Sequence, residues 1–373
     1  MKTEKAENSI REILTLADIH INGNHPWDIR VNDKSFYQQT ILNGSMGAGE
    51  AYMEKRWECL RLDEFFNHVF RAAIEDKIRT KWELIAEVFL TKIFNRQTRS
   101  RAFRVGQKHY DLDNHLFECM LDKRMTYTGA YWKGATTLDE AQENKLDLTC
   151  RKLNLRKGMH ILDIGCGWGS FAKFAAEKYG VSVTGITVSK EQVKFGKDMC
   201  EGLPVDFILT DYRDMKGKFD HIVSLGMFEH VGVKNYRTYM KVAHRCLKDD
   251  GIFLLHTIGG NTSGTTNDAW IDKYIFPNSM LPSIKQIGEA IEGIFVMEDW
   301  HNFSADYDRT LMAWNNNFAT HWDELKDRYD EKFYRMWTYY LLMCAGSFRA
   351  RKNQLWQIVL SKKGVIGGYE STR

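Results

Sequence analysis

From about residue 158 onward, short apolar runs alternate with amphipathic segments in which apolar residues recur at a spacing of three and four. The runs predict strands at Met159–Ile164, Val181–Ile186, Val205–Leu209, Phe219–Ser224 and Ile252–His256. The segments between them predict helices at Phe171–Lys178, Lys190–Cys200 and Tyr236–Leu247. Strands that alternate with helices are typical of parallel βαβ units with right-handed crossovers. We therefore expect an α/β fold with one doubly wound sheet, which binds its ligands outside the carboxyl ends of the strands.

Residues 1 to about 90 show a different pattern, with few alternating β-branched positions. Apolar residues have helical spacing in Leu60–Ala73 and Lys81–Phe94, whereas Asn43-Gly44, Gly47 and Gly49 indicate a turn region. This pattern predicts a smaller, mainly helical N-terminal domain at 1–91, a linker at 92–108 and a larger domain at 109–373.

Composition is that of a globular protein: 43% of the 373 residues are hydrophobic and 27% are charged. The formal net charge of +3 is too small to hold a polyanion, so any attraction to one must come from local clustering. The seven cysteines are odd in number and form no CxxC pair, which argues against a disulfide framework or a structural zinc site. Aromatic residues reach 13%, and these can fill a core or line an apolar site.

The predicted linker is strongly basic, with no acidic residue between Glu87 and Asp111. Its basic residues are Lys92, Arg96, Arg99, Arg101, Arg104 and Lys108. Such a run is either a solvated linker surface or a patch that lies on an anionic membrane, where each charge contributes about 1 kcal/mol. The chain has no secretory signal at its start and no run near the ~18 apolar residues that cross a bilayer, so we expect a cytoplasmic protein.

The first predicted strand runs into Asp163-Ile164-Gly165-Cys166-Gly167-Trp168-Gly169. Glycines allow a sharp strand-to-helix turn and a close approach of backbone N–H groups to a ligand. A dinucleotide site and a purely structural turn are alternatives, but Asp163 would repel a pyrophosphate and suits a ligand that carries an amino group. The pattern resembles the class I S-adenosylmethionine (SAM) dependent methyltransferases, which have a Rossmann-like sheet.

That resemblance implies a set of cosubstrate-binding residues. Next to the methionine part it implies Asp163, Gly165, Cys166, Gly167, Trp168 and Gly169, with Tyr127 and Thr128 as further candidates. On the ribose side it implies Thr187, Ser189 and Gln192, and beside the adenine Asp211, Tyr212 and Arg213. Thr187 departs from the acidic residue that is usual at that position.

Further blocks narrow the resemblance to one family. They are MTYTGAYW (Met125–Trp132), LDIGCGWGS (Leu162–Ser170), GITVSKEQ (Gly185–Gln192), SLGMFEHVG (Ser224–Gly232), LLHTIG (Leu254–Gly259) and WHNFSADYDRTLMAW (Trp300–Trp314). In this order they resemble the cyclopropane-fatty-acyl-phospholipid synthases, relatives of the mycolic acid methyltransferases, and the N-terminal block Asp28–Cys59 shares in the resemblance. The family methylates the cis double bond of an acyl chain in a membrane phospholipid and closes a three-membered ring.

This reaction requires a site that excludes water and holds no nucleophile, because methyl transfer to an alkene leaves a carbocation. Aromatic faces stabilise a cation without trapping it, and the stretch Trp300–Trp314 is expected to wall the acyl pocket. The resemblance implies a bound bicarbonate as the proton acceptor. Its implied ligands are Glu229, His256, Tyr307, the backbone at Ile258, and Gly129.

Glu229, His256 and Tyr307 are accordingly the expected catalytic residues, with the Glu229 carboxyl group bonded to His256 or to the anion. Gly129 stands where the family usually shows the cysteine of a Y-S-C-A-Y motif, so a thiol is absent there. Cys344 is a further catalytic candidate by resemblance, but the favoured explanation is a small buried residue on an apolar helix at Tyr339–Phe348, since a thiolate would trap the cation.

The resemblance therefore implies an enzyme that uses SAM and bicarbonate, contacts unsaturated phospholipids at the inner face of the membrane, and forms a homodimer through the N-terminal domain. Neither nucleic acid nor a metal is expected. Two alternatives stay open: methylation of the double bond without ring closure, and a non-catalytic protein that binds a lipid surface.

Overall fold

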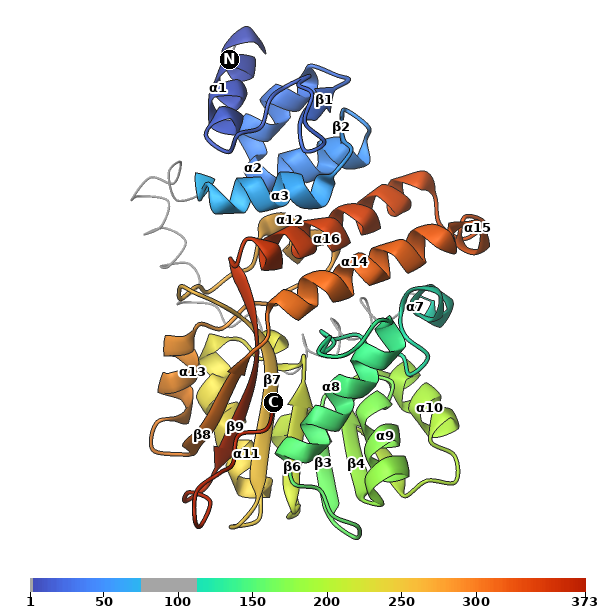
Figure 1. The fold of residues 1–373 in the computed structure, drawn as a ribbon, viewed down its shortest axis with the longest axis vertical. Helices are drawn as coiled ribbons and strands as arrows, with labels where there is room; N and C mark the ends of the chain where they lie inside the picture. The colour runs from blue at the N-terminus through green and yellow to red at the C-terminus, as the bar shows by residue number, and fades with distance from the viewer. Residues whose placement is uncertain (1–2, 75–112) are drawn as a thin grey trace. The chain divides into compact units, whose positions relative to one another are not determined.

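The computed structural model describes residues 3–74 and 113–373, which form two compact units (Figure 1). Within these residues, the first unit contains 3–74, 267–277 and 307–353, and the second contains 113–266, 278–306 and 354–373. This division differs from the predicted boundaries, because two segments of the predicted domain at 109–373 join the N-terminal unit. The predicted linker at 92–108 and the predicted helix at Lys81–Phe94 lie outside the described residues.

The second unit is built on a seven-stranded sheet with the order β5-β4-β3-β6-β7-β9-β8. Its strands are β3 (His160–Ile164), β4 (Ser182–Thr187), β5 (Val205–Leu209), β6 (His221–Leu225), β7 (Ile252–Gly260), β8 (Val296–Asn302) and β9 (Asn353–Ser361). Strand β3 pairs in parallel with β4 and β6, and β6 with β7, whereas β8 and β9 are antiparallel. The structure confirms the five predicted strands, while β8 and β9 were not predicted.

Side chains alternate between two cores, one on each face of the sheet. Leu162 and Ile164 of β3 join a cluster with α11 (Tyr236–Cys246) and α13 (Ile284–Ile291), whereas Ile161 joins a cluster with α8 (Leu138–Lys152) and α9 (Ser170–Tyr179). The predicted helices are present as α9, α10 (Lys190–Met199) and α11. The doubly wound α/β fold is thereby confirmed.

The first unit is mainly helical, as predicted. Its elements are α1 (Thr3–Thr15), β1 (Ile29–Val31), α2 (Ser35–Met53), β2 (Trp57–Cys59), α3 (Leu62–Arg71), α12 (Ala269–Tyr274), α14 (Ala305–Thr320), α15 (Trp322–Leu325) and α16 (Glu331–Arg349). Helix α16 packs against α2 and α3, so segments distant in sequence share one core. Among the described residues, no helix is long and apolar enough to span a membrane.

The turn region predicted at Asn43-Gly44, Gly47 and Gly49 is confirmed at Gly44, whose φ of 55° and ψ of −133° are not helical, so that α2 consists of two helical segments joined there. The prediction is wrong at Gly47 and Gly49, which lie within the second helical segment. Gly49 is required for packing instead: a Cβ there would lie 2.5 Å from the Trp270 ring. The short antiparallel pair of β1 and β2 was not predicted.

Candidate active site

A glycine-rich turn connects β3 to α9 at the carboxyl edge of the sheet. Gly165, Gly167 and Gly169 have φ of 82°, 55° and 93°, which favours glycine at all three. Space is also limited, since a Cβ on Gly165 would lie 2.5 Å from Cγ of Met227, and one on Gly169 would lie 2.5 Å from Cζ of Phe207. The turn therefore needs all three glycines for its conformation, as the sequence predicts, and Gly165 and Gly169 also for close packing.

Two buried ionisable residues, Asp163 and Lys145, lie close to this turn. Asp163 is 1% exposed, and its Oδ1 has no hydrogen-bond partner in the described part of the chain. Burial raises the pKa of Asp163 to about 7, against the opposing effect of Lys145. Burial likewise lowers the pKa of Lys145 to about 7, although Asp122 and Asp163 oppose it. Both groups lie in surroundings that disfavour isolated charge.

The segment with Tyr127 and Thr128 meets the strand ends through short contacts. Lys145 Nζ donates to Thr128 Oγ1 at 2.8 Å, and Gln142 Nε2 donates to the Thr128 carbonyl at 2.8 Å. A Cβ on Gly226, just after β6, would lie 2.6 Å from Thr128 Cγ2. The blocks MTYTGAYW and SLGMFEHVG are therefore neighbours in space.

Aromatic rings line the same region. Phe117, on α7 (Asn114–Met120), packs against Tyr127 with ring centroids 5.2 Å apart and against Trp168 at 4.8 Å. Trp168 Nε1 also donates to Asn114 Oδ1 at 3.1 Å. Trp168 is thus fixed by α7 beside the glycine-rich turn, and Cys166 is buried near Gly185.

The predicted ribose residues form one hydrogen-bonded cluster after β4. Thr187 Oγ1 donates to Gln192 Oε1 at 2.6 Å and accepts the Ser189 N–H at 3.2 Å. Ser189 is the N-cap of α10 and accepts the Gln192 N–H at 3.3 Å. The three side chains are mutually satisfied, so a neutral hydroxyl–amide surface replaces the acid that is usual there.

The three residues that were predicted to flank the adenine, Asp211, Tyr212 and Arg213, lie in different surroundings. Asp211 pairs with Arg213 through Oδ1–Nε at 2.7 Å and Oδ2–Nη2 at 2.6 Å. The Tyr212 ring belongs to the hydrophobic core and lies 5.0 Å from the Tyr239 ring. The structure therefore brings Asp211 and Arg213 together after β5 and turns the Tyr212 ring inward.

Glu229 and His256 follow β6 and lie on β7, and both are buried. Glu229 Oε1 accepts the Ile258 N–H at 2.6 Å, while Oε2 has no hydrogen-bond partner among residues 3–74 and 113–373. Burial raises the pKa of Glu229 to about 7, opposed by the Ile258 N–H. Both ring nitrogens of His256 also have no partner in these ranges, and burial lowers its pKa well below the usual value.

These contacts bear on the expectation that the Glu229 carboxyl group bonds to His256 or to the bound anion. The Glu229 carboxyl group bonds to the Ile258 N–H rather than to His256, because that N–H points at Oε1 across the end of β7. The Ile258 N–H is therefore already hydrogen-bonded, and it holds the Glu229 carboxyl group in place. Gly129 is buried in the same unit, and the Phe303 ring lies 5.7 Å from His256.

Tyr307 lies near the start of α14 in the first unit and is 8% exposed. Its ring packs against Phe348 at 4.6 Å and Trp314 at 5.8 Å. The second unit brings Glu229, His256 and Ile258 together, whereas the approach of Tyr307 to them stays a prediction.

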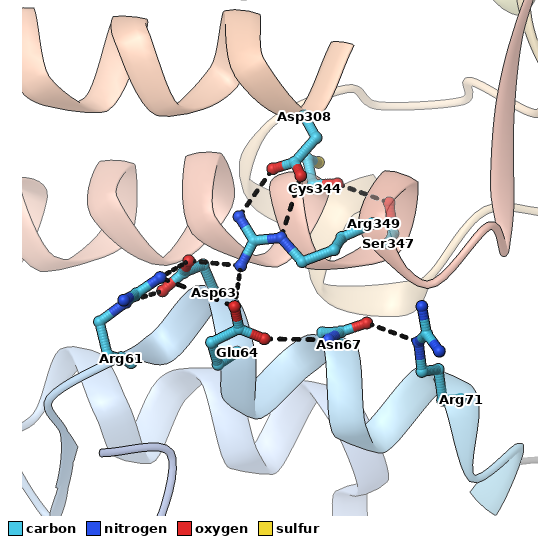
Figure 2. Close-up of polar contacts among 9 residues, drawn as sticks. All are labelled: Arg61, Asp63, Glu64, Asn67, Arg71, Asp308, Cys344, Ser347 and Arg349. Atoms are coloured by element: carbon cyan, nitrogen blue, oxygen red, sulfur yellow. Dashed lines mark hydrogen bonds and ion pairs between the residues drawn. The ribbon is translucent and has the colours of Figure 1, made fainter. Parts of the chain in front are cut away.

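Cys344 lies on α16 within the apolar helix that the sequence predicts (Figure 2). Its carbonyl accepts the Ser347 hydroxyl at 2.7 Å. Burial, with a contribution from Asp268, raises the pKa of the Cys344 thiol to about 12. The thiol is therefore protonated at neutral pH, which favours the structural explanation over a catalytic one.

Comparison with known proteins identifies the family. A sequence model described as mycolic acid cyclopropane synthetase matches residues 97–358. The chain belongs to this family. It is accordingly an enzyme, a SAM-dependent C-methyltransferase, and the alternative of a non-catalytic lipid-binding protein is wrong.

Some known members of the family match this chain along almost its whole length. The chain is 52% identical over 362 residues to the cyclopropane-fatty-acyl-phospholipid synthase of Escherichia coli K12, covering 97% of this chain and 94% of that one. It is 38% identical over 275 residues to a probable fatty acid methyltransferase of Pseudomonas putida, covering 70% of each. The solved cyclopropane synthase MmaA2 from Mycobacterium tuberculosis superposes with a TM-score of 0.66 at 33% identity, covering 70% of this chain and 98% of that one.

Two features of this protein were not predicted from its sequence: the buried Lys145 and the cluster of ion pairs around Arg349. Lys145 lies on the buried stripe of α8 with Ala141, Leu148 and Lys152, and a lysine at a core-facing helical position is the signal that could have found it.

The second feature is an ion cluster around Arg349, the last residue of α16 (Figure 2). Arg349 bonds Asp308 through Nε–Oδ2 at 2.9 Å and Nη2–Oδ1 at 2.8 Å. Its Nη1 donates to Asp63 Oδ2 at 2.6 Å and to Glu64 Oε1 at 2.7 Å on α3. Asp308 directly follows Tyr307 and Arg349 directly follows Phe348, so the ion pair and the Tyr307–Phe348 ring contact connect the same two helices, α14 and α16.

Proposed function

We propose that this enzyme transfers the methyl carbon of SAM to the cis double bond of an unsaturated acyl chain in a membrane phospholipid and closes a cyclopropane ring. The observation that carries the proposal is the buried pair Glu229 and His256 at the carboxyl ends of β6 and β7, beside the glycine-rich turn. Both side chains favour their uncharged forms in this site. The 52% identity with the Escherichia coli synthase supports the same substrate class.

The electron flow explains why such a site is suitable. The alkene π electrons form a new C–C bond to the methyl group, the C–S bond breaks, and sulfur keeps the electron pair. The carbocation that remains on the acyl chain loses a proton from the transferred methyl group, and the electrons of that C–H bond close the ring. No residue needs to attack the substrate, so a site of uncharged buried groups avoids trapping the cation.

The chain's own residues have distinct roles in this proposal. Lys145 and Asp163 hold the Thr128 segment and the glycine-rich turn around the cosubstrate. The Phe303 ring, 5.7 Å from His256, offers an electron-rich face near the reacting carbons. The Ile258 N–H orients Glu229 so that Oε2 is the oxygen free to carry a proton.

The residues fit a small bound anion such as bicarbonate. Glu229 Oε2, when protonated, and the N–H of neutral His256 are two buried donors that have no other partner in the described ranges. We propose that these two groups, with Tyr307 and the backbone at Gly129, hold it, while Ile258 acts through Glu229. Bicarbonate, when bound, supplies the base that accepts the methyl proton.

A second candidate is methyl addition without ring closure, which gives a branched or methylene product. Gly129 replaces the cysteine that is usual in the family, and the Pseudomonas putida relative is described as a probable fatty acid methyltransferase. Both observations concern how the proton is lost rather than whether the methyl group is transferred.

We also propose that the enzyme is cytoplasmic, visits the inner face of the membrane through its basic segment, and forms a homodimer through the N-terminal segment. Changing Arg96, Arg99, Arg101 and Arg104 to Gln should lower binding to anionic vesicles and leave SAM affinity unchanged. Equal vesicle binding by both proteins would contradict the membrane role. Sedimentation that shows a fully active monomer would contradict the dimer.

The proposed reaction is tested with SAM labelled in its methyl group. Label should enter vesicles of a phospholipid with cis-unsaturated chains and should not enter vesicles of the saturated phospholipid with the same headgroup. His256→Gln, which replaces the imidazole without adding charge, should reduce incorporation at least tenfold. Label in saturated lipid, or none in either, would overturn the proposal.

A further inference from the structure

A loop between α1 and β1 brings two histidines to one carboxylate, far in sequence from the active-site motifs. His20 Nδ1 lies 3.6 Å from Asp28 Oδ1, and His25 Nδ1 lies 3.2 Å from Asp28 Oδ2. The ligand atoms of all three residues lie within 4.8 Å of one another. The imidazoles are 50% and 49% exposed, whereas the Asp28 side chain is only 3% exposed.

The loop backbone fixes the carboxylate relative to both histidines. Asp28 Oδ1 accepts the His20 N–H at 2.7 Å, and Oδ2 accepts the His25 N–H at 2.8 Å. Gly23 makes room for this arrangement, since a Cβ there would overlap Asp28 Oδ2. Burial raises the pKa of Asp28, whereas the two N–H donors and the neighbouring His25 and His20 imidazoles lower it, and the net result lies below its usual value. The carboxylate is therefore held in one orientation between the two imidazoles.

The His25 ring is also held in place by its neighbours. It stacks on Trp27 with centroids 4.8 Å apart and planes 2° apart, and Trp27 also stacks on His68 with centroids 4.6 Å apart. His68 Nδ1 lies 2.9 Å from the Ala17 carbonyl oxygen, so this third imidazole is engaged elsewhere. His25 is thus preorganised, and His68 offers a matched control.

The donor set indicates which ion the loop suits. Ligand atoms about 2.0–2.1 Å from a tetrahedral Zn²⁺ are separated by roughly 3.3 Å, which matches the 3.2 Å between His25 Nδ1 and Asp28 Oδ2. His20 Nδ1 faces the other oxygen, Oδ1, and one ligand atom from each of the three residues lies within 4.8 Å of the others, so a small rotation of the exposed His20 ring would complete the set. Two imidazole nitrogens with one carboxylate favour zinc, nickel or copper over magnesium or calcium, which prefer oxygen ligands. We propose that His20, His25 and Asp28 bind a divalent transition metal of the zinc class, with water completing the coordination on the exposed side.

Such an ion would join the loop to the sheet of the first unit. Asp28 directly precedes β1, whose Ile29 pairs with Cys59 of β2. Because the ligands are separated when the loop unfolds, binding stabilises the folded first unit by an amount that grows with the logarithm of the ion's affinity.

The test uses the full chain without an affinity tag, freed of metal with a chelator. Calorimetric titration with Zn²⁺ alone should show one site in the wild type, and the double variant His20→Ala with His25→Ala should bind it at least 100-fold more weakly. His68→Ala, which removes an imidazole from the same aromatic stack, and Cys59→Ser, which removes the neighbouring thiol, should both bind Zn²⁺ like the wild type. Zn²⁺ should raise the thermal midpoint of the wild type and not that of the double variant.

His20→Ala alone keeps the His25–Trp27 stack and should still weaken binding at least tenfold, so a packing defect in the double variant does not obscure the result. Equal Zn²⁺ affinity and stoichiometry in wild type and double variant would overturn the proposal, as would loss of binding in Cys59→Ser alone. Titration with Mg²⁺ should show no site, and a magnesium affinity equal to that for Zn²⁺ would also contradict it.

Discussion

Three buried ionisable residues, Asp163, Glu229 and Lys145, lie in surroundings that disfavour their charged forms. Burial raises the pKa of Asp163 and of Glu229 to about 7 and lowers that of Lys145 to about 7. These residues are costly for folding unless they are kept neutral or paired. Their retention at the edge of the sheet is consistent with a site that must develop a cation and offer it no nucleophile.

Glu229 should therefore make stability depend on pH. A carboxyl group whose pKa is raised on folding binds its proton more tightly in the folded chain, so stability falls as pH rises from about 4.5 to about 7. At roughly 1.4 kcal/mol per pKa unit, the loss approaches about 3 kcal/mol. Glu229→Gln keeps the acceptor for the Ile258 N–H and should lack this loss, as measured by urea unfolding at pH 5 and pH 8.

The exposed carboxylate of Glu289 on α13 provides the control, because Glu289→Gln should follow the wild type at both pH values. If the wild type and Glu229→Gln lose stability in parallel between pH 5 and pH 8, Glu229 is not held in its protonated form by the site.

Lys145 should matter for cosubstrate binding. Lys145→Met removes the hydrogen bond to Thr128 and a cation that opposes the raised pKa of Asp163, so we expect S-adenosylhomocysteine to bind about tenfold more weakly by calorimetry. Lys152→Met is the matched control, because Lys152 is buried on the same helix but contacts His301 at 3.0 Å. Equal losses in both variants would indicate a general packing effect instead.

At the scale of elements, the Arg349 cluster connects α3 to the helix that carries Tyr307 (Figure 2). Arg349→Gln leaves Asp63, which is 2% exposed, with fewer donors and should lower the free energy of unfolding by about 2 kcal/mol. If the cluster positions Tyr307, kcat should also fall roughly tenfold while the KM for SAM stays the same.

A double-mutant cycle separates positioning from stability. In a Tyr307→Phe background, Arg349→Gln should reduce kcat by a much smaller factor, because the hydroxyl it positions is already absent. Arg71→Gln, which removes only a contact with Asn67 on α3, should change neither quantity. Full additivity of the two losses in kcat would contradict the positioning role.

Gly259 should be intolerant of any side chain. A Cβ on this residue of β7 would overlap the Trp356 ring of β9, so Gly259→Ala should lower the free energy of unfolding by about 3 kcal/mol. Gly288 on α13 has open space around it, and Gly288→Ala should instead stabilise the protein by about 0.5–1 kcal/mol. Chemical unfolding of both variants measures the contrast, and a loss at both positions would contradict the packing account.

The elements that the sequence predicts well are those with a strong local signal. Strands β3, β6 and β7 contribute buried apolar residues to both faces of the sheet, so their sequences are nearly continuous apolar runs that leave few alternatives. In contrast, β8 has the sequence VMEDWHN and lies at the sheet edge, where polar residues hide the pattern. Gly49 of α2 was predicted wrongly as part of a turn because a glycine required by a distant ring, Trp270, looks the same in sequence as a glycine in a turn.

The residues of the candidate site also differ in how well the sequence predicts them. The glycine-rich turn and the residues after β4 to β7 were predictable, because parallel strands deliver their carboxyl ends to one edge. Lys145 and Arg349 were not, since their roles depend on partners such as Thr128 and Asp63 that are distant in sequence.

At the scale of the whole molecule, the near-neutral charge of +3 conceals the basic segment, whose residues lie outside the described ranges. The first unit combines the N-terminal segment with α12, α14 and α16, so the N-terminal segment and the helix that carries Tyr307 belong to one core. This arrangement predicts that the N-terminal segment is required for the folding of α14.

The most direct test of the account is the structure of the lipid product. Phospholipid vesicles with cis-unsaturated chains and SAM should yield acyl chains that are heavier by one CH₂, lack vinyl protons and show the upfield proton resonances of a cyclopropane ring by NMR. Acyl chains that gain the same mass but retain vinyl or methylene alkene protons would contradict ring closure.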